Sequence, residues 1–282
     1  MKKLTRRQLI TLGSVGAFGA LLGEALLEPN RLETIRRNVR IQNLPPSFEG
    51  FRIGVLSDIH WGHAIDHTFV SRAIHLLLET KPDLIVLPGD FFHSSQFHSR
   101  ELQPLEGLFG SLSAKHGVVG VLGNHDHGAG ADLVRKELSV NSPIRLIDND
   151  HLMIEIGSDS LAVGGVGDLW EDEVKLDRAF AGVAKDIPRI LLSHNPDVAE
   201  QVKIDPGTRV DLQISGHTHG GQMILPGIYD PTSEVSSYGS KFNRDLVKGK
   251  RHQVFISKGI ARLNRMRFCA LPDVACLTLV RA

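Results

Sequence analysis

Residues 51–60 read FRIGVLSDIH, in which a short apolar run is followed by Ser57, Asp58 and His60. The length of the run and its β-branched residues predict a buried strand that ends in polar side chains. Residues 82–90, PDLIVLPGD, have the same form, and the stretch FVSRAIHLLLET between them has the apolar spacing of an amphipathic helix. This strand, helix, strand order predicts an α/β fold with a largely parallel sheet covered by helices.

The rest of the body continues this alternation and then becomes richer in strands. Residues 101–112 (ELQPLEGLFGSL) are predicted to form a helix and residues 115–126 (KHGVVGVLGNHD) a strand. Residues 226–250 are polar and rich in turn formers, so we expect one long surface loop there. The later strands indicate a second sheet packed against the first, and they are expected within residues 144–148, 151–157, 160–168, 188–197, 209–221, 252–257 and 274–280.

The first 30 residues have the features of an export signal. Four basic residues among the first seven precede an uncharged run over residues 8–23, which is shorter than the roughly 20 residues that span a bilayer comfortably. The sequence TRRQLI resembles a twin-arginine motif. We expect residues 1–30 to engage the export machinery, and residues 45–282 to form one domain in the periplasm or on the outer face of the cytoplasmic membrane. The alternative is an N-terminal helix packed on the domain.

The composition argues against several classes of function. The chain has 282 residues, with 32 Lys and Arg against 32 Asp and Glu, so it lacks the basic excess usual in nucleic-acid-binding proteins. Aromatic residues make up 6% of the chain, too few to suggest a platform for stacked bases. Cys269 and Cys276 have no CxxC spacing and indicate neither a disulfide framework nor a zinc knuckle. Nucleic acid is therefore not an expected partner.

Polar side chains follow five of the predicted strands at the point where each strand ends. Ligand sites in open α/β sheets lie beyond the carboxyl ends of the strands, so we expect one crevice to gather groups that are far apart in sequence. His217 and His219 in GHTHGGQ lie two residues apart, which in an extended segment points both rings to one face. The donors are oxygen and nitrogen without sulfur: Asp58, His60, Asp90, Asn124, His194, His217 and His219.

Seven such donors exceed what one tetrahedral zinc ion requires, and they suit two adjacent divalent ions with one carboxylate between them. Carboxylate and imidazole ligands favour Mn, Fe or Zn over copper or an iron–sulfur cluster. A two-metal site supports displacement at a phosphoryl group, because it stabilises the attacking and departing oxygens and lowers the pKa of water. The residues therefore predict a dinuclear metal centre that hydrolyses a phosphoester.

The ordered motifs DIH, GD, GNHD, H and GHTH resemble the signature of the calcineurin-like metallophosphoesterases, and the likeness covers about residues 50–280. The resemblance implies a four-layer α/β/β/α sandwich of two mixed sheets. It also implies two sets of metal ligands that share a bridging Asp90: Asp58, His60 and His219 in one, and Asn124, His194 and His217 in the other.

The same resemblance implies catalytic roles for two neighbouring residues. His125 would contact the phosphate and protonate the leaving oxygen, and Asp126 would orient its imidazole, since a carboxylate partner fixes the tautomer of a histidine. A finer likeness, carried by VGDLW, LLSHNPD and GHTHGGQ, is to exported bacterial phosphodiesterases of the YaeI and YkuE type. Their relatives include enzymes that cleave the pyrophosphate of UDP-diacylglucosamine in lipid A synthesis.

The segment before the last predicted strand, SKGIARLNRMRFCALPDV, departs from that branch, whose members have few charges there. Its arginines, Arg262, Arg265 and Arg267, make it basic. We expect Arg262 and Arg265 to bind a second anionic group of the substrate, such as a diphosphate or a lipid headgroup. The alternative is that these side chains lie on a solvated face.

The function that the sequence predicts is a monomeric, metal-dependent phosphodiesterase, which acts on a phosphodiester or diphosphate of a lipid-linked or UDP-linked substrate. A phosphomonoesterase and a nuclease are the other enzymatic interpretations, and the balanced charge disfavours the nuclease. A catalytically silent metal-binding scaffold is the interpretation from a different class. His125 and Asp126 argue against it, because a scaffold needs no acid beside its metals.

Overall fold

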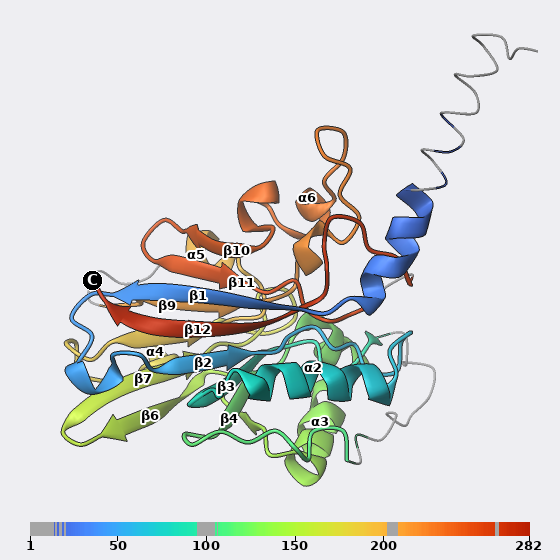
Figure 1. Cartoon of the computed structure of the whole chain (residues 1–282). Helices are drawn as coiled ribbons and strands as arrows, with labels where there is room; N and C mark the ends of the chain where they lie inside the picture. Colours follow the sequence, from blue (N-terminus) through green and yellow to red (C-terminus); the bar gives the residue numbers. More distant parts are fainter. Residues whose placement is uncertain are drawn as a thin grey trace, which may run out of the picture.

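The computed structural model describes residues 14, 16, 19, 21–94, 105, 107–201, 208–262 and 265–282. Two six-stranded mixed sheets pack face to face (Figure 1). In the first sheet only β12 and β2 pair antiparallel, and all other neighbours are parallel. Its strands, in spatial order, are β1 (Glu33–Ile41), β12 (Asp273–Arg281), β2 (Arg52–Val55), β3 (Leu84–Pro88), β4 (Val118–Val121) and β5 (Arg145–Leu146).

The second sheet has a parallel centre with an antiparallel strand at each edge. Apart from the edge strand β10, its strands overlap apolar runs that were expected to form it. The runs over residues 144–148 and 274–280 were also expected here, but they form β5 and β12 of the first sheet. The spatial order is β10 (Asp245–Lys248), β11 (Gln253–Ile256), β9 (Leu212–Ser215), β8 (Arg189–Leu192), β7 (Asp159–Gly165) and β6 (Asp150–Ile156).

Helices cover the outer faces of both sheets, so the expected four-layer arrangement is present. The first sheet carries α2 (His67–Glu79) and α3 (Asn124–Asn141), and the second carries the short α4 (Leu176–Ala179) and α5 (Val198–Gln201). The α2 helix begins where the Asp66 carboxylate accepts the Phe69 N–H. The largely apolar layer between the sheets includes Ile53, Val86, Val163, Ile214 and Phe255.

Three local expectations were wrong. Residues 107–111 form turns instead of a helix, and residues 101–104 and 106 lie outside the described part of the chain. The strand expected over residues 115–126 is only β4, because α3 starts at Asn124 and uses Gly123 as its N-cap. The predicted loop over residues 226–250 contains α6 (Thr232–Val235), the 3-10 turn η5 (Gly239–Phe242) and the strand β10.

The first sheet begins before residue 45, where we expected the domain to start. β1 pairs along its whole length with β12, although its sequence ETIRRNVRI is rich in charge. An edge strand accommodates those charges because one side of it faces solvent. Residues 21–27 are helical, and the turn η1 (Glu28–Asn30) is held to the body because Glu28 accepts the N–H groups of Cys269 and Ala270. Most of the predicted signal lies outside the described residues.

No helix among the described residues is long and apolar enough to cross a membrane.

Candidate metal centre

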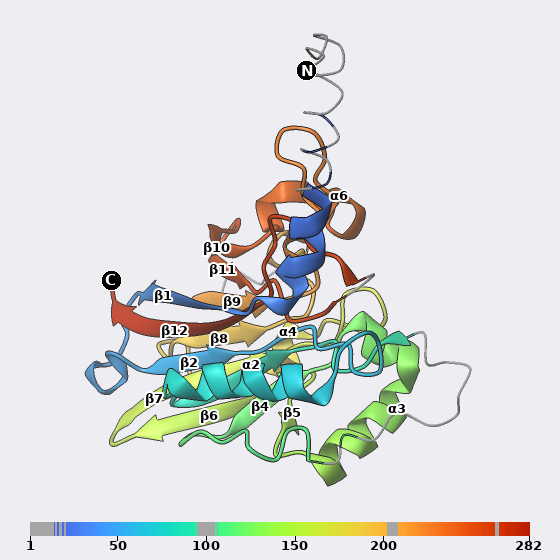
Figure 2. The same ribbon diagram turned by 45° about the vertical axis from the view of Figure 1, so that its right-hand side comes forward.

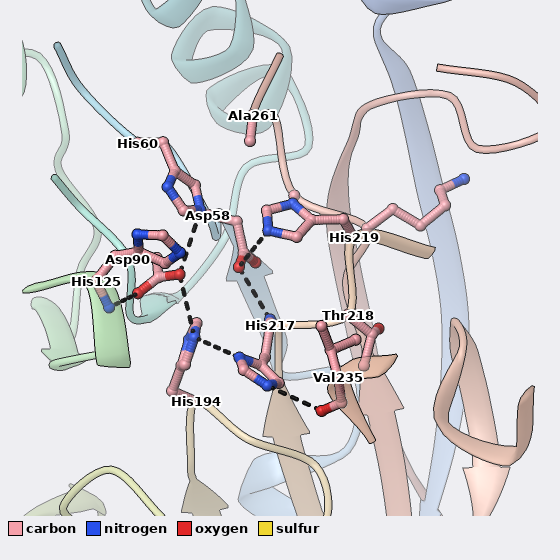
Figure 3. A network of polar contacts seen from close by, with 12 residues as sticks. Asp58, His60, Asp90, His125, His194, His217, Thr218, His219, Val235 and Ala261 are labelled. Atoms are coloured by element: carbon pink, nitrogen blue, oxygen red, sulfur yellow. Dashed lines mark hydrogen bonds and ion pairs between the residues drawn. The ribbon is translucent and has the colours of Figure 1, made fainter. Parts of the chain in front are cut away.

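The polar groups that follow five strands meet at one end of the two sheets (Figure 3). Asp58, Asp90 and Asn124 come after β2, β3 and β4, which are neighbours in the first sheet. His194 and His217 come after β8 and β9, which are neighbours in the second. The face-to-face packing of the sheets therefore brings together residues that are far apart in sequence, such as Asp58 and His217, which are 159 positions apart and whose contact is a hydrogen bond from the His217 N–H to the Asp58 carboxylate.

The first group of possible metal ligands comes from the segments that follow β2, β3 and β9. Asp58, His60, Asp90 and His219 each offer one ligand atom, and these atoms all lie within 4.8 Å of one another. His60 Nε2 lies 3.2 Å from Asp90 Oδ2, and His219 Nε2 lies 3.8 Å from Asp58 Oδ1. All four side chains are buried. This group could hold one divalent cation.

A second group lies on the other side of Asp90. His194 Nε2 is 3.3 Å from Asp90 Oδ2 and 3.1 Å from Asn124 Oδ1. His217 Nδ1 is 3.0 Å from the same Asn124 oxygen and 3.1 Å from His194 Nε2. The Asp90 carboxylate thus stands between two clusters of nitrogen and oxygen donors, as a bridging ligand would.

The backbone sets the tautomers of two of these histidines for ligation. His194 donates from Nδ1 to the carbonyl of Pro88 at 2.8 Å, which leaves Nε2 free for a metal ion or for a second proton. His217 donates from Nε2 to the carbonyl of Val235 at 3.1 Å, which leaves Nδ1 free. In each case the free nitrogen is the one that faces Asn124. Such outer hydrogen bonds orient metal-ligating imidazoles.

Several buried atoms of the site fit a metal ion better than any protein partner. Among the described residues, Asp58 Oδ2, His60 Nε2, Asp90 Oδ2 and His219 Nδ1 make no hydrogen bond, and buried polar atoms without partners are costly. Burial opposes protonation of His194, yet the negative charge of Asp90 and Asp58 outweighs it and raises the pKa of His194 to about 10. The same negative charge favours a divalent cation, and the donor set suits Mn, Fe or Zn.

The backbone at the site is strained in a way that brings the ligands inward. Five of the seven predicted ligands have left-handed φ between 50° and 70°, a region that costs non-glycine residues energy and is concentrated at functional sites. Glycine makes the close approach possible: a Cβ on Gly216 would lie 2.2 Å from Asp58 Oδ2. The strained residues are Asp58, His60, Asp90, His217 and His219.

His125 is held beside the bridge, but not by Asp126 as we expected. Its backbone N–H donates to Asp90 Oδ1 at 3.0 Å, and its Nδ1 lies 2.7 Å from the Ser94 hydroxyl and accepts the Ser94 N–H at 3.3 Å. The Asp126 carboxylate instead accepts the N–H groups of Phe92 and Gly123. The orienting role predicted for Asp126 is therefore wrong, because its carboxylate ties two loop backbones together.

The environment of His125 keeps its ring neutral near pH 7. Burial, helped by the nearby His60 and His194 and opposed by Asp90, lowers the pKa of His125 to about 4. Since Nδ1 accepts hydrogen bonds, the ring proton sits on Nε2. His125 is also the second residue of α3, so the N-terminal end of the α3 dipole faces the same space and favours negative charge there.

Comparisons with known proteins point to a family of metal-dependent enzymes. The family model for calcineurin-like phosphoesterases matches residues 51–221. The chain is 30% identical to the uncharacterized metallophosphoesterase YkuE of Bacillus subtilis, over 99% of both chains. It is 30% identical to phosphodiesterase YaeI of Escherichia coli over 90% of each chain, and 27% identical to the UDP-2,3-diacylglucosamine pyrophosphatase LpxG of Chlamydia trachomatis over 88% of this chain and 89% of that protein.

The chain belongs to the calcineurin-like phosphoesterase family. It is therefore a metallophosphoesterase, a hydrolase of a family that binds divalent metal ions, and the cluster of aspartates and histidines is its candidate metal site.

The three arginines of the segment before β12 have different surroundings in this phosphoesterase. Arg267 is fully buried and donates to three backbone carbonyls, so it holds the segment together. Arg262 lies over the Phe69 ring at 3.7 Å and within 3.6 Å of the Asp66 carboxylate. Arg265 is exposed, and it shares a surface hollow with Arg262. Substrate binding by Arg262 and Arg265 stays a prediction.

Two tryptophans near the site differ in exposure, and Ser94 is a site residue that the sequence analysis missed. Trp61 is buried in the core. Trp170 is 51% exposed and meets the His217 ring edge-on at 4.4 Å, so it borders the second group of donors. Ser94 was missed because no motif marks a serine four residues after Asp90. His93, which stacks on His63 at 4.1 Å and on His125 at 4.9 Å, extends a column of rings beside the site.

Proposed function

We propose that this metallophosphoesterase uses two divalent ions to hydrolyse a phosphodiester or a diphosphate bond. The observation that carries the proposal is the position of Asp90 between two separate donor groups, each of which includes two histidines. Asp58, His60 and His219 would hold one ion, Asn124, His194 and His217 the other, and Asp90 would contact both. Ions held there supply positive charge to a phosphoryl oxygen and lower the pKa of water.

The chain's own groups provide the remaining parts of the chemistry. His125 keeps a proton on Nε2, from which it can donate a hydrogen bond to a phosphoryl or departing oxygen. The negative charge of a bound phosphate raises the pKa of the ring, so that Nδ1 can take up a second proton from solvent; the imidazolium can then give its Nε2 proton to the departing oxygen and return to the neutral form. The α3 N-terminus adds positive potential on the same side. Ser94 keeps the imidazole in the tautomer that this role needs.

The test compares variants of the bridge and of the acid. Asp90→Asn is expected to lower turnover of bis-p-nitrophenyl phosphate by about 10³-fold or more, with loss of bound metal, because the shared ligand is removed. His125→Ala is expected to lower turnover by about 10²-fold with metal content unchanged, the usual size of a general acid's contribution. Elemental analysis and steady-state kinetics with manganese-loaded protein measure both. One ion per chain, or loss of metal in His125→Ala, would contradict the proposal.

The substrate class is proposed from the relatives. A phosphodiesterase and two UDP-2,3-diacylglucosamine pyrophosphatases match most of the chain, so we propose a lipid-linked or UDP-linked phosphoester as the substrate, cleaved outside the cytoplasm after export through the N-terminal segment. Comparing turnover of UDP-diacylglucosamine, a glycerophosphodiester and p-nitrophenyl phosphate tests this. Faster turnover of the monoester would favour a phosphomonoesterase.

A further inference from the structure

Large apolar side chains on the described surface are concentrated in two short segments. Leu21, Leu22, Leu26 and Leu27 are between 42% and 53% exposed, although they belong to one helical stretch over residues 21–27. In the second segment Leu225 is 39%, Tyr229 47% and Ile228 84% exposed. Contiguous apolar surface of this kind marks an interaction site. We call these two segments together the apolar rim.

Both parts of the rim lie next to each other, because both hydrogen-bond to the backbone of residues 267–268 or adjoin residues that do. The Arg267 N–H donates to the Ala25 carbonyl at 3.0 Å. The neighbouring Phe268 accepts the Ile224 N–H at 3.0 Å and donates its own N–H to the Gln222 carbonyl at 2.8 Å. Figures 1 and 2 both show the 225–229 loop rising beside the N-terminal helix on the same side of the molecule.

The rim also borders the metal centre. The 225–229 loop follows the turn η4 (His219–Gly221) a few residues later in the chain, and the first residue of that turn is a candidate ligand. A surface hollow of about 290 Å³ is lined by His219 together with Met223 and with Tyr229 of the loop. The loop of the rim therefore shares a hollow with one candidate ligand, His219. A second hollow is lined by Leu26 of the rim and by the exposed Arg265.

We propose that the apolar rim docks on a lipid bilayer and holds the metal centre at the membrane surface. The chain itself favours this occupant: the helical stretch over residues 21–27 continues, toward the N-terminus, the uncharged run of residues 8–23 that follows four basic residues. An apolar segment with basic flanks partitions to lipid. A loop whose Ile228 is exposed beside that segment enters the same interface, where tyrosine and leucine are favourable.

The test places a reporter in the loop of the full-length chain. In a Cys269→Ser and Cys276→Ala background, Ile228→Cys is labelled with an environment-sensitive fluorophore and mixed with phosphatidylcholine–phosphatidylglycerol vesicles that contain brominated lipids. The matched control is Val140→Cys, which is also exposed and lies near the end of α3, a helix that Figure 1 shows at the bottom of the molecule, away from the N-terminal helix. We expect at least a twofold loss of fluorescence at residue 228 and none at residue 140.

Three outcomes would overturn the proposal. If the protein sediments with the vesicles but the label at residue 228 is not quenched, the loop does not contact lipid and the N-terminal segment alone accounts for binding. Equal quenching at residue 140 would mean that the molecule has no fixed orientation on lipid. Fluorescence that responds to protein concentration without lipid would indicate a contact between copies of the chain. None of these readouts depends on catalysis, so the failure of this proposal is distinguishable from the failure of the proposed function.

A second measurement connects the rim to turnover. Leu225→Ser combined with Ile228→Ser is expected to lower hydrolysis of a long-chain phosphodiester in vesicles about tenfold, while turnover of soluble bis-p-nitrophenyl phosphate stays the same. Val140→Ser serves as the matched control and should change neither rate. An equal rate on the vesicle substrate in the double variant would count against docking by the loop.

Discussion

Ser94 is the residue that holds the His125 ring, through a hydroxyl 2.7 Å from Nδ1 and a backbone N–H at 3.3 Å. Ser94→Ala keeps the backbone contact and removes the hydroxyl, so the ring loses part of what fixes its tautomer. We expect kcat for bis-p-nitrophenyl phosphate to fall about tenfold, the lower end of what partners of active-site histidines contribute. Ser94→Thr should restore most of the rate.

Metal content and the pH dependence of kcat distinguish this positioning role from a structural one. Metal content should be the same in the wild type, Ser94→Ala and Ser94→Thr, while the pH profile of Ser94→Ala should shift. An unshifted profile with an unchanged rate would show that the Ser94 hydroxyl does not act through His125.

His252 makes the stability of the protein depend on pH, independently of the metal centre. It is buried, with Nε2 at 3.2 Å from Gln213 Oε1. Burial, opposed by the charge of Glu200, lowers the pKa of His252 from 6.5 to about 4. Between these values the unfolded chain binds more protons than the folded one, so the free energy of unfolding falls as the pH falls.

The expected contribution of His252 is about 3 kcal/mol between pH 6.5 and pH 4. Urea unfolding at pH 7 and pH 4.5 measures it. His252→Gln keeps a polar side chain without a titrating group, so its free energy of unfolding should change less between the two pH values. An equal change in the variant and the wild type would show that His252 does not account for it.

At the scale of elements, the segment between β9 and β11 is a functional part of the fold. Its α6 helix ends at Val235, whose carbonyl sets the tautomer of His217. The Asp197 carboxylate anchors the following residues, since it accepts the Ser236 hydroxyl at 2.6 Å and the Ser237 N–H at 2.8 Å. The segment around α6 therefore orients His217, a candidate metal ligand, through a hydrogen bond to its ring.

The segment before β12 depends on one buried cation. Arg267 donates to the carbonyls of Ala261, Ala270 and Lys258 at 2.8–3.0 Å, and burial lowers its pKa to about 10, so it stays charged at neutral pH. Arg267→Lys cannot reach three separate acceptors with one ammonium. Urea unfolding should show a loss of about 3 kcal/mol. Arg265→Lys, at an exposed position, is the control and should lose almost none.

At the scale of the whole molecule, metal binding should couple the two sheets. Ligands come from both sheets and are buried, so the folded chain binds metal and the unfolded chain does not present the site. Manganese at about a hundredfold its Kd should add about 2.7 kcal/mol, which raises Tm by about 5–10 °C in a chain of this size. Differential scanning calorimetry with and without a chelator measures the shift.

Asp90→Asn is the control for this experiment, because the variant lacks the shared ligand. Its Tm should not respond to manganese. A wild-type Tm that is insensitive to chelation would mean that the buried carboxylates are satisfied without a cation.

Local sequence was sufficient for β2 and β3, two of the strands that end in the site. In FRIGVLSDIH and PDLIVLPGD the change from apolar to polar residues marks where β2 and β3 end, because a buried strand tolerates no uncompensated Asp58 or Asp90. β1 and β10 were missed, because edge strands carry charge and lack the apolar run. α3 was missed because its first turn, NHD, belongs to the site and has no apolar spacing.

The sequence by itself determined the donor chemistry, the order of the motifs and hence the family. Only the tertiary structure decided which atoms meet: it gave Ser94 the contact with His125 that the neighbouring Asp126 was expected to make, buried Arg267, and placed the 225–229 loop beside the N-terminal helix. The physical reason is that residue types and short-range periodicity are local properties. Contacts across two packed sheets depend on backbone directions set by the whole fold.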